Sequence, residues 1–399
     1  MFKPAGYCCF VVLCIFGCSL LLGCSSGGDQ PSQLTTEQLL ARGQAELESV
    51  TTNPTINHAD ARSILRAATR DFSSVLNETP TDARAKLGLA LADIFYGYTD
   101  LLELSPSFAD KIWQNLLLQP GTRSLVNDGP LEVPYRMAQA PRSRSSDMQT
   151  AQLRVLSGTL SIMREGLPFL TDVEQAVQNG ATLQLRTYLG GRVVTVTFGV
   201  ADVQLVNAFG NLVTALLNLG VAYNLDMPQN SPLQPIPIDA NADGKFSAGE
   251  YLLASPFLES FYPSALGSFL QYLRLAAIQA EAGCSLSGHT MGTNALVDVT
   301  NPDVQDALEK LQAQASVLKT ACVSQVTTNV FFQDGLTRTV NLPGLTQLGS
   351  FRPYMPTFQV DNLEDIPGVW PDTTFGGVFT PGLAQDEVVL YYKDLEHAY

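Results

Sequence analysis

The sequence is poor in basic residues and in histidine, and this limits its possible functions. Its 399 residues include 23 Lys and Arg against 38 Asp and Glu, for a net charge of −15, and only 3 His. Binding of nucleic acid needs a basic stripe that neutralises phosphates, so we expect no nucleic-acid partner. The three histidines are far apart in the sequence, and no paired-histidine or Cys-x-x-Cys spacing typical of zinc sites is present.

The sequence motifs of common enzyme classes are also absent. There is no Gly-x-Ser-x-Gly elbow, no P-loop, no dinucleotide-binding glycine pattern and no His-Glu-x-x-His. Ser285 lies near His289, but such a pair is more typical of a polar loop than of a nucleophile and its base. We therefore predict no catalytic residue and favour a non-enzymatic protein. A hydrolase that uses unpatterned carboxylates is the alternative, because the distance between two acids is set by the fold.

Residues 1–23 have the composition of a targeting segment. Lys3 supplies a positive start, and the apolar run Tyr7–Leu22 is too short to span a membrane comfortably. The run ends in Leu21-Leu22-Gly23-Cys24, which resembles the bacterial lipobox. The resemblance implies removal of residues 1–23 as a signal peptide and acylation of Cys24 with palmitate-type chains. The alternative is an uncleaved anchor, which would also place the chain outside the cytoplasm.

The residues that follow Cys24 indicate where such a lipoprotein resides. Ser25, rather than aspartate, comes next, which in the lipoprotein family points to the outer membrane. Residues 24–34 are rich in Ser and Gly and are predicted to form a flexible tether. We expect a cell-envelope protein attached to the outer membrane by its N-terminal lipid, in the periplasm or facing the surface.

Cysteine usage agrees with an extracytoplasmic location. Four of the seven cysteines lie within residues 1–23 and the fifth is Cys24, so only Cys284 and Cys322 remain. Two remaining thiols in an oxidising compartment predict one disulfide between them. Two separate buried thiols are the alternative.

The most specific motif is Asp-Ala-Asn-Ala-Asp-Gly-Lys-Phe-Ser-Ala-Gly-Glu at residues 239–250. It matches the twelve-residue EF-hand calcium loop at every constrained position and resembles that family over the loop. Calcium takes six to eight oxygen ligands, so carboxylates and carbonyls must converge from one short segment. The resemblance implies a Ca²⁺ site with these ligands: Asp239, Asn241, Asp243, the Lys245 carbonyl, Ser247 or a bridging water, and bidentate Glu250.

The flanks of this loop depart from a complete EF-hand. Pro232, Pro235 and Pro237 favour an extended entry instead of an incoming helix, and no second loop is present to pair with it. Calcium sensors open a pair of helices, so a structural role is favoured over sensing. The alternative is an acidic turn that binds no metal.

Residues 35–120 are predicted to be helical. Within Thr35–Leu104, apolar residues recur at helical spacing in three successive segments. Ala68, Phe72 and Pro80 match the second-helix pattern of a tetratricopeptide repeat, and Ala85–Gly88 resembles the start of the next repeat. That resemblance implies a protein partner at the helical region. The repeat glycines, Gly43 and Gly88, are about 45 residues apart instead of 34, so a plain helical hairpin is the alternative.

Residues 147–342 are predicted to form a helical core with small β hairpins. The uncharged run Val203–Leu225 has a stripe of Asn207, Asn211 and Asn218, which favours the core helix of a water-soluble domain over a membrane span. The other expected elements are a helix from Asp147 to Pro168, strands at 182–188 and 192–198, helices at 263–281 and 302–323, and a hairpin at 330–342.

Residues 343–399 differ in composition from the rest. The part from 343 to 382 is rich in Pro, Gly and aromatic residues, which predicts an irregular segment that wraps over the helices. The aromatic residues are predicted to anchor it; a surface that binds sugars or peptides is the alternative.

The sequence therefore predicts a mainly α fold, either a helical bundle or repeat-like helical hairpins, with small β hairpins (α+β). The favoured function is an envelope-anchored lipoprotein that binds calcium structurally and acts as a binding or scaffolding module. Ala222–Asp226 and Phe375–Gly377 resemble segments of uncharacterised bacterial lipoproteins, a family likeness that implies no activity.

Overall fold

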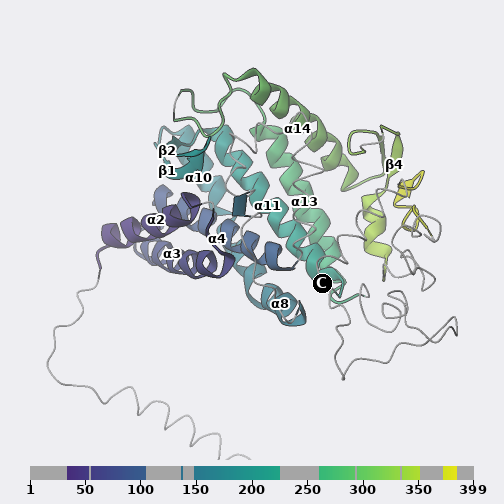
Figure 1. Cartoon of the computed structure of the whole chain (residues 1–399), viewed down its shortest axis with the longest axis horizontal. Helices are drawn as coiled ribbons and strands as arrows, with labels where there is room; N and C mark the ends of the chain where they lie inside the picture. Colours follow the sequence, from purple (N-terminus) through teal and green to yellow (C-terminus); the bar gives the residue numbers. More distant parts are fainter. Residues whose placement is uncertain are drawn as a thin grey trace, which may run out of the picture.

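The computed structural model describes most of the helical part of the chain. The described residues are 34–53, 55–104, 136–137, 148–224, 260–292, 294–332, 335–350 and 372–383. They form a mainly α fold with one two-stranded and one three-stranded antiparallel sheet, which confirms the predicted fold class (Figure 1). One hydrophobic cluster extends from Leu40 to Leu308. The helices before and after residues 105–147 therefore share a core.

The chain begins with three helices, α2 (Thr36–Thr51), α3 (His58–Glu78) and α4 (Ala83–Leu104). Thr35 and Gln38 form a reciprocal capping box at the start of α2, and Asn57 caps α3 by accepting from the Asp60 amide. These caps satisfy amides that the first helical turn leaves without partners. The three helices that the sequence predicts here are confirmed.

Phe72 of α3 lies between α2 and α4. A Cβ atom on Gly43 would lie 3.2 Å from its ring, and a Cβ on Gly88 would lie 2.3 Å from it. Gly88 must therefore be glycine for α4 to approach α3 this closely. The two glycines and the phenylalanine that suggested a tetratricopeptide repeat thus meet at one packing contact, but the repeat assignment itself stays a prediction.

A broken helix follows, made of α8 (Met148–Arg154), a π-helical turn η2 (Val155–Thr159) and α9 (Leu160–Gly166). The amide of Leu160 donates to the carbonyl of Val155, five residues back, which defines the π turn. Pro168 then precedes α10 (Phe169–Gln178). The helix predicted from Asp147 to Pro168 is present, but the π turn was not predicted.

The centre of the fold is the helix α11 (Val200–Ala222), which packs along α13 (Ser264–Gly283) and against α4 (Figure 1). By length and composition α11 could cross a membrane, the one such helix among the described residues, but 67% of its apolar window is buried inside the fold. It is thus the predicted core helix. Its asparagines are buried, and Asn211 and Asn218 donate to the carbonyls of Asn207 and Thr214 within the helix.

The strands β1 (Gln184–Leu189) and β2 (Arg192–Thr197) form the predicted hairpin around Gly190 and Gly191. Both glycines have positive φ, as a tight two-residue turn requires. The hairpin is fixed to α2, because Thr51 donates its hydroxyl to the Arg186 carbonyl at 2.7 Å.

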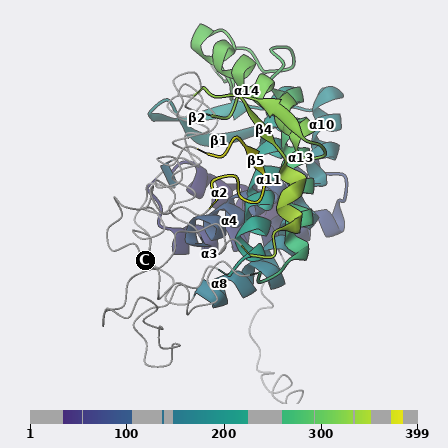
Figure 2. The ribbon, with the colours of Figure 1, turned by 90° about the vertical axis from the view of Figure 1, so that its right-hand side faces the viewer.

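The last helix, α14 (Pro302–Ala321), leads into a small sheet. Its strands are β3 (Val326–Thr328), β4 (Arg338–Val340) and β5 (Phe379–Thr380), and the turn η3 (Leu342–Gln347) lies nearby (Figure 2). The hairpin predicted at 330–342 is shifted, since its first strand ends at Thr328. β5 belongs to the segment predicted to be irregular. It gains regular structure because the free edge of β4 supplies the hydrogen-bond partners that an isolated segment lacks.

Candidate functional site

The predicted lipidation and calcium sites fall outside the described residues. These sites are Cys24 and the loop ligands Asp239, Asn241, Asp243, Lys245, Ser247 and Glu250. Within the described part of the chain, no group of three or more His, Cys, Asp or Glu side chains is placed to hold a metal ion. Both sites stay predictions.

The two ends of the segment that contains the calcium motif are described. Tyr223 pairs with Ser260 in an isolated antiparallel bridge, and the amides of Phe261 and Tyr262 both donate to the Ala222 carbonyl, at 2.9 and 3.2 Å. Residues 225–259 therefore leave the end of α11 and return at the start of α13 through one closed stem.

The side chain of Gln152, in α8, holds this stem from inside the fold. Its Nε2 donates to the carbonyls of Gly220 and Tyr223, each at 2.7 Å, and the residue is completely buried. Tyr223 is held at its other end too, since its hydroxyl donates to the Leu348 carbonyl at 3.3 Å. The segment that contains the calcium motif thus begins at the end of α11 and ends at the start of α13, and both points are hydrogen-bonded to the fold.

The predicted disulfide between Cys284 and Cys322 is not present: both are buried free thiols. Cys322 packs with Phe269 and Leu273 of α13, whereas Cys284 follows the other end of the same helix. Leu273, which packs with Cys322, and Cys284 are 11 residues apart along this helix. At 1.5 Å per residue this places the two cysteines roughly 16 Å apart, far beyond disulfide reach. Burial raises the pKa of the Cys284 thiol to about 12 and that of Cys322 to about 11, so both stay protonated.

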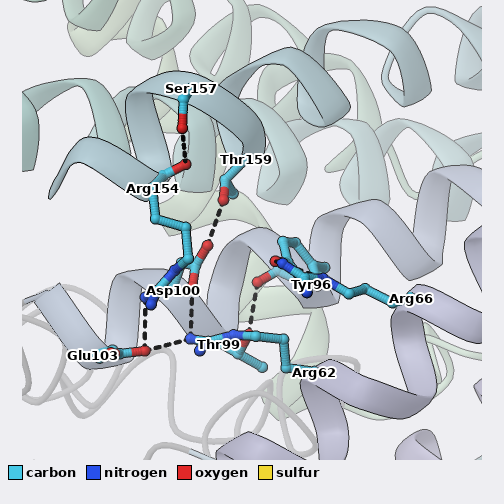
Figure 3. A network of polar contacts seen from close by, with 9 residues as sticks. All are labelled: Arg62, Arg66, Tyr96, Thr99, Asp100, Glu103, Arg154, Ser157 and Thr159. Atoms are coloured by element: carbon cyan, nitrogen blue, oxygen red, sulfur yellow. Dashed lines mark hydrogen bonds and ion pairs between the residues drawn. The ribbon is translucent and has the colours of Figure 1, made fainter. Parts of the chain in front are cut away.

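The most charged buried site in the described structure is a cluster of two arginines and two acids, Arg62, Arg154, Asp100 and Glu103, which we call the ion cluster (Figure 3). The Nη2 atoms of Arg62 and Arg154 donate to Asp100 Oδ1, at 2.6 and 3.1 Å. Both atoms also donate to Glu103 Oε2. The cluster is neutral overall, and it joins α3, α4 and α8.

Asp100 is the centre of the ion cluster. Its side chain is 0% exposed, and its second oxygen, Oδ2, accepts from the Thr159 hydroxyl. Thr159 ends the π turn, which adds a residue to its helix and so turns the hydroxyl toward α4. Burial lowers the pKa of the Arg62 guanidinium, but the adjacent Asp100 and Glu103 carboxylates more than offset this, and the pKa is raised. Arg62 therefore remains charged.

A second buried acid, Asp93, lies on the same helix one heptad earlier. It accepts from the Thr69 hydroxyl at 3.0 Å, and its Oδ2 lies so close to Gly166 that a Cβ there would come within 2.3 Å. No cation is paired with it in the described structure. Burial raises the pKa of Asp93 to about 8, and the charge of nearby Glu165 acts in the same direction. Asp93 is therefore mostly protonated at pH 7.

A buried pair of Asp202 and His289 fastens the connection after α13 to the start of α11. His289 Nδ1 donates to Asp202 Oδ1 at 2.7 Å, and Asp202 Oδ2 accepts from the Gly199 amide at 2.8 Å. In the described structure His289 Nε2 has no hydrogen-bond partner, and the hydroxyls of Ser285 and Ser287 bond each other. No hydrogen bond joins Ser285 to His289 within the described residues.

These buried charges were missed in the sequence, although a signal was present. Asp93 and Asp100 are seven residues apart and are the only charged residues in the stretch Leu87–Leu102 of α4, so both lie on one face of an apolar stretch. Acids in an apolar run are seldom buried without a partner. The partners Arg62, Arg154 and Thr159 could not be found in the same way, because they come from two other helices.

Comparison of the chain with protein-family models, with curated proteins and with solved structures finds no match in any of the three.

Proposed function

We propose that the protein is a lipid-anchored envelope module that binds one calcium ion in the loop 239–250 and uses its helical body as a binding or scaffolding surface. The twelve-residue match of Asp239–Glu250 to the EF-hand loop carries the proposal. The closed stem at Tyr223 and Ser260 supports it, because calcium bound between these ends would tie the exit of α11 to the entry of α13. The ion is thus structural.

Calcium is expected to stabilise the protein modestly. An unpaired loop with a proline-rich entry is poorly preorganised, so we expect a dissociation constant on the order of 0.1 to 1 mM. At about 1 mM calcium this adds about 0.4 to 1.4 kcal/mol to the free energy of unfolding, or a few degrees in melting temperature. Glu250→Gln should abolish most of that increment, because it removes the bidentate ligand at nearly constant size.

The measurement is a set of melting curves with calcium and with chelator. Glu259→Gln, in the same segment but outside the loop, is the matched control and should keep the wild-type increment. Equal increments in wild type and Glu250→Gln, or no heat of binding up to several millimolar calcium, would contradict the site. Magnesium should replace calcium poorly, since it demands octahedral geometry and gives up water reluctantly.

The lipid anchor makes a separate prediction. Cys24→Ser should leave residues 1–23 attached and remove the acyl mass, because both steps depend on the thiol of the lipobox cysteine. The readouts are the intact mass of the purified protein and its distribution between membrane and soluble fractions. Cys18→Ser, inside the signal segment, is the control and should be processed normally. An N-terminal mass that Cys24→Ser leaves unchanged would rule out lipidation.

A further inference from the structure

The connection between α13 and α14 has an unusual surface. Between Glu281 and Asp298 there is no Asp, Glu, Lys or Arg, although 15% of the whole chain is charged. Met291 is 71% exposed and Leu286 is 43% exposed, the first being the most exposed large apolar side chain in the described structure. Their positions lie on either side of His289, whose own side chain is fully buried.

The exposure of these apolar side chains does not come from a loosely held loop. His289 is bonded to Asp202, the Ala201 amide donates to the Gly288 carbonyl at 3.1 Å, and the Thr197 amide donates to the Asn294 carbonyl at 2.8 Å. A Cβ atom on Gly199 would lie 2.2 Å from the Gly288 carbonyl, so the base of the loop packs directly on backbone. Leu286 and Met291 are therefore presented from a fixed base.

The acids next to this loop are bonded to groups within the fold. Glu281 pairs with Lys319, buried Asp202 is bonded to His289, and exposed Asp298 accepts from the Thr300 amide and hydroxyl. A lipid interface favours apolar side chains that bring no charge with them, because charges are costly to desolvate there.

The N-terminal anchor would keep a bilayer within reach of the loop. The tether from Cys24 to Leu34 spans at most about 40 Å. The helix α2 starts at Thr36, and its other end contacts the hairpin through Thr51 and Arg186. The second strand of that hairpin pairs with the loop through Thr197 and Ala295.

We propose that Leu286 and Met291 contact the lipid surface to which the chain is anchored, so that the protein rests on the bilayer through this loop. The inference rests on the proposed membrane anchor and adds an orientation to it. The two side chains enter the interfacial region of the bilayer.

The test uses the full-length protein in vesicles of phosphatidylethanolamine and phosphatidylglycerol. Met291→Cys is labelled with an environment-sensitive fluorophore, which the buried native thiols should not take up. Leu153→Cys is the matched control, since Leu153 is 52% exposed on α8, at the opposite end of the molecule (Figure 1). A quencher attached to the lipid acyl chains should quench the label at 291 at least roughly threefold more than the label at 153.

Equal quenching at the two positions would overturn the loop contact. A signal at 291 that rises with protein concentration in the absence of vesicles would also overturn it, in favour of contact with a second copy of the chain. Cys24→Ser keeps its apolar leader and still reaches the vesicle, and it is labelled with the four leader cysteines, Cys8, Cys9, Cys14 and Cys18, replaced by alanine. Its missing acyl mass then reports on lipidation while the label at 291 reports on the loop. The two proposals can thus fail separately.

Discussion

Replacing Asp100 with asparagine should lower the free energy of unfolding by about 3–5 kcal/mol. The carboxylate is 0% exposed and accepts from Arg62, Arg154 and Thr159. Without its charge, two partly buried guanidinium groups share one remaining acid, Glu103. Removing one member of a buried ion pair leaves an uncompensated charge, which costs far more than the pair itself contributes.

Urea unfolding of three variants measures this effect. Asp306→Asn, which breaks an exposed pair with Lys310, is the control and should cost less than about 1 kcal/mol. The double variant Asp100→Asn/Arg154→Gln restores charge balance and should recover part of the loss, even if Asp100→Asn alone fails to fold. A loss for Asp100→Asn no larger than that of Asp306→Asn would show that the ion cluster is solvated and contributes little.

Asp93 should make the protein less stable as the pH rises. In the folded state burial raises the pKa of Asp93 to about 8, whereas an unfolded aspartate has a pKa of about 3.9. Between these two values the unfolded chain has lost a proton that the folded chain retains. The contribution of Asp93 is therefore fully present below about pH 4 and is lost as the pH rises to about 8, a total of roughly 6 kcal/mol.

Asp93→Asn removes this dependence, because the amide stays neutral and its oxygen can still accept from Thr69. We expect the variant to be more stable than wild type by roughly 6 kcal/mol at pH 9 and by only about 1.5 kcal/mol at pH 5. Urea unfolding at pH 5, 7 and 9 gives the difference directly. Asp306→Asn, at an exposed site, should run parallel to wild type over the same range. Parallel curves for Asp93→Asn would mean that Asp93 titrates normally.

Local patterns predicted the elements of the fold well. The periodicity of α3, the glycine pair of the β1–β2 hairpin and the uncharged run of α11 each specify an element through residues close together in the chain. The start of β3 was misplaced, because a three-residue strand carries too little pattern to define its ends. The predicted disulfide was wrong because an even number of cysteines says nothing about the distance between them in the fold.

The sequence by itself determined the amphipathic helices, and it predicts lipidation at Cys24 and calcium binding in the loop 239–250, because all three depend on neighbours in the chain. Only the tertiary structure decided which charges are buried together. Asp100 is paired with Arg62 and Arg154, which lie on two other helices. Asp93 is shielded from water because Gly166, which has no side chain, allows α9 to pack closely against α4. Burial and pairing depend on contacts distant in sequence, so no local pattern encodes them.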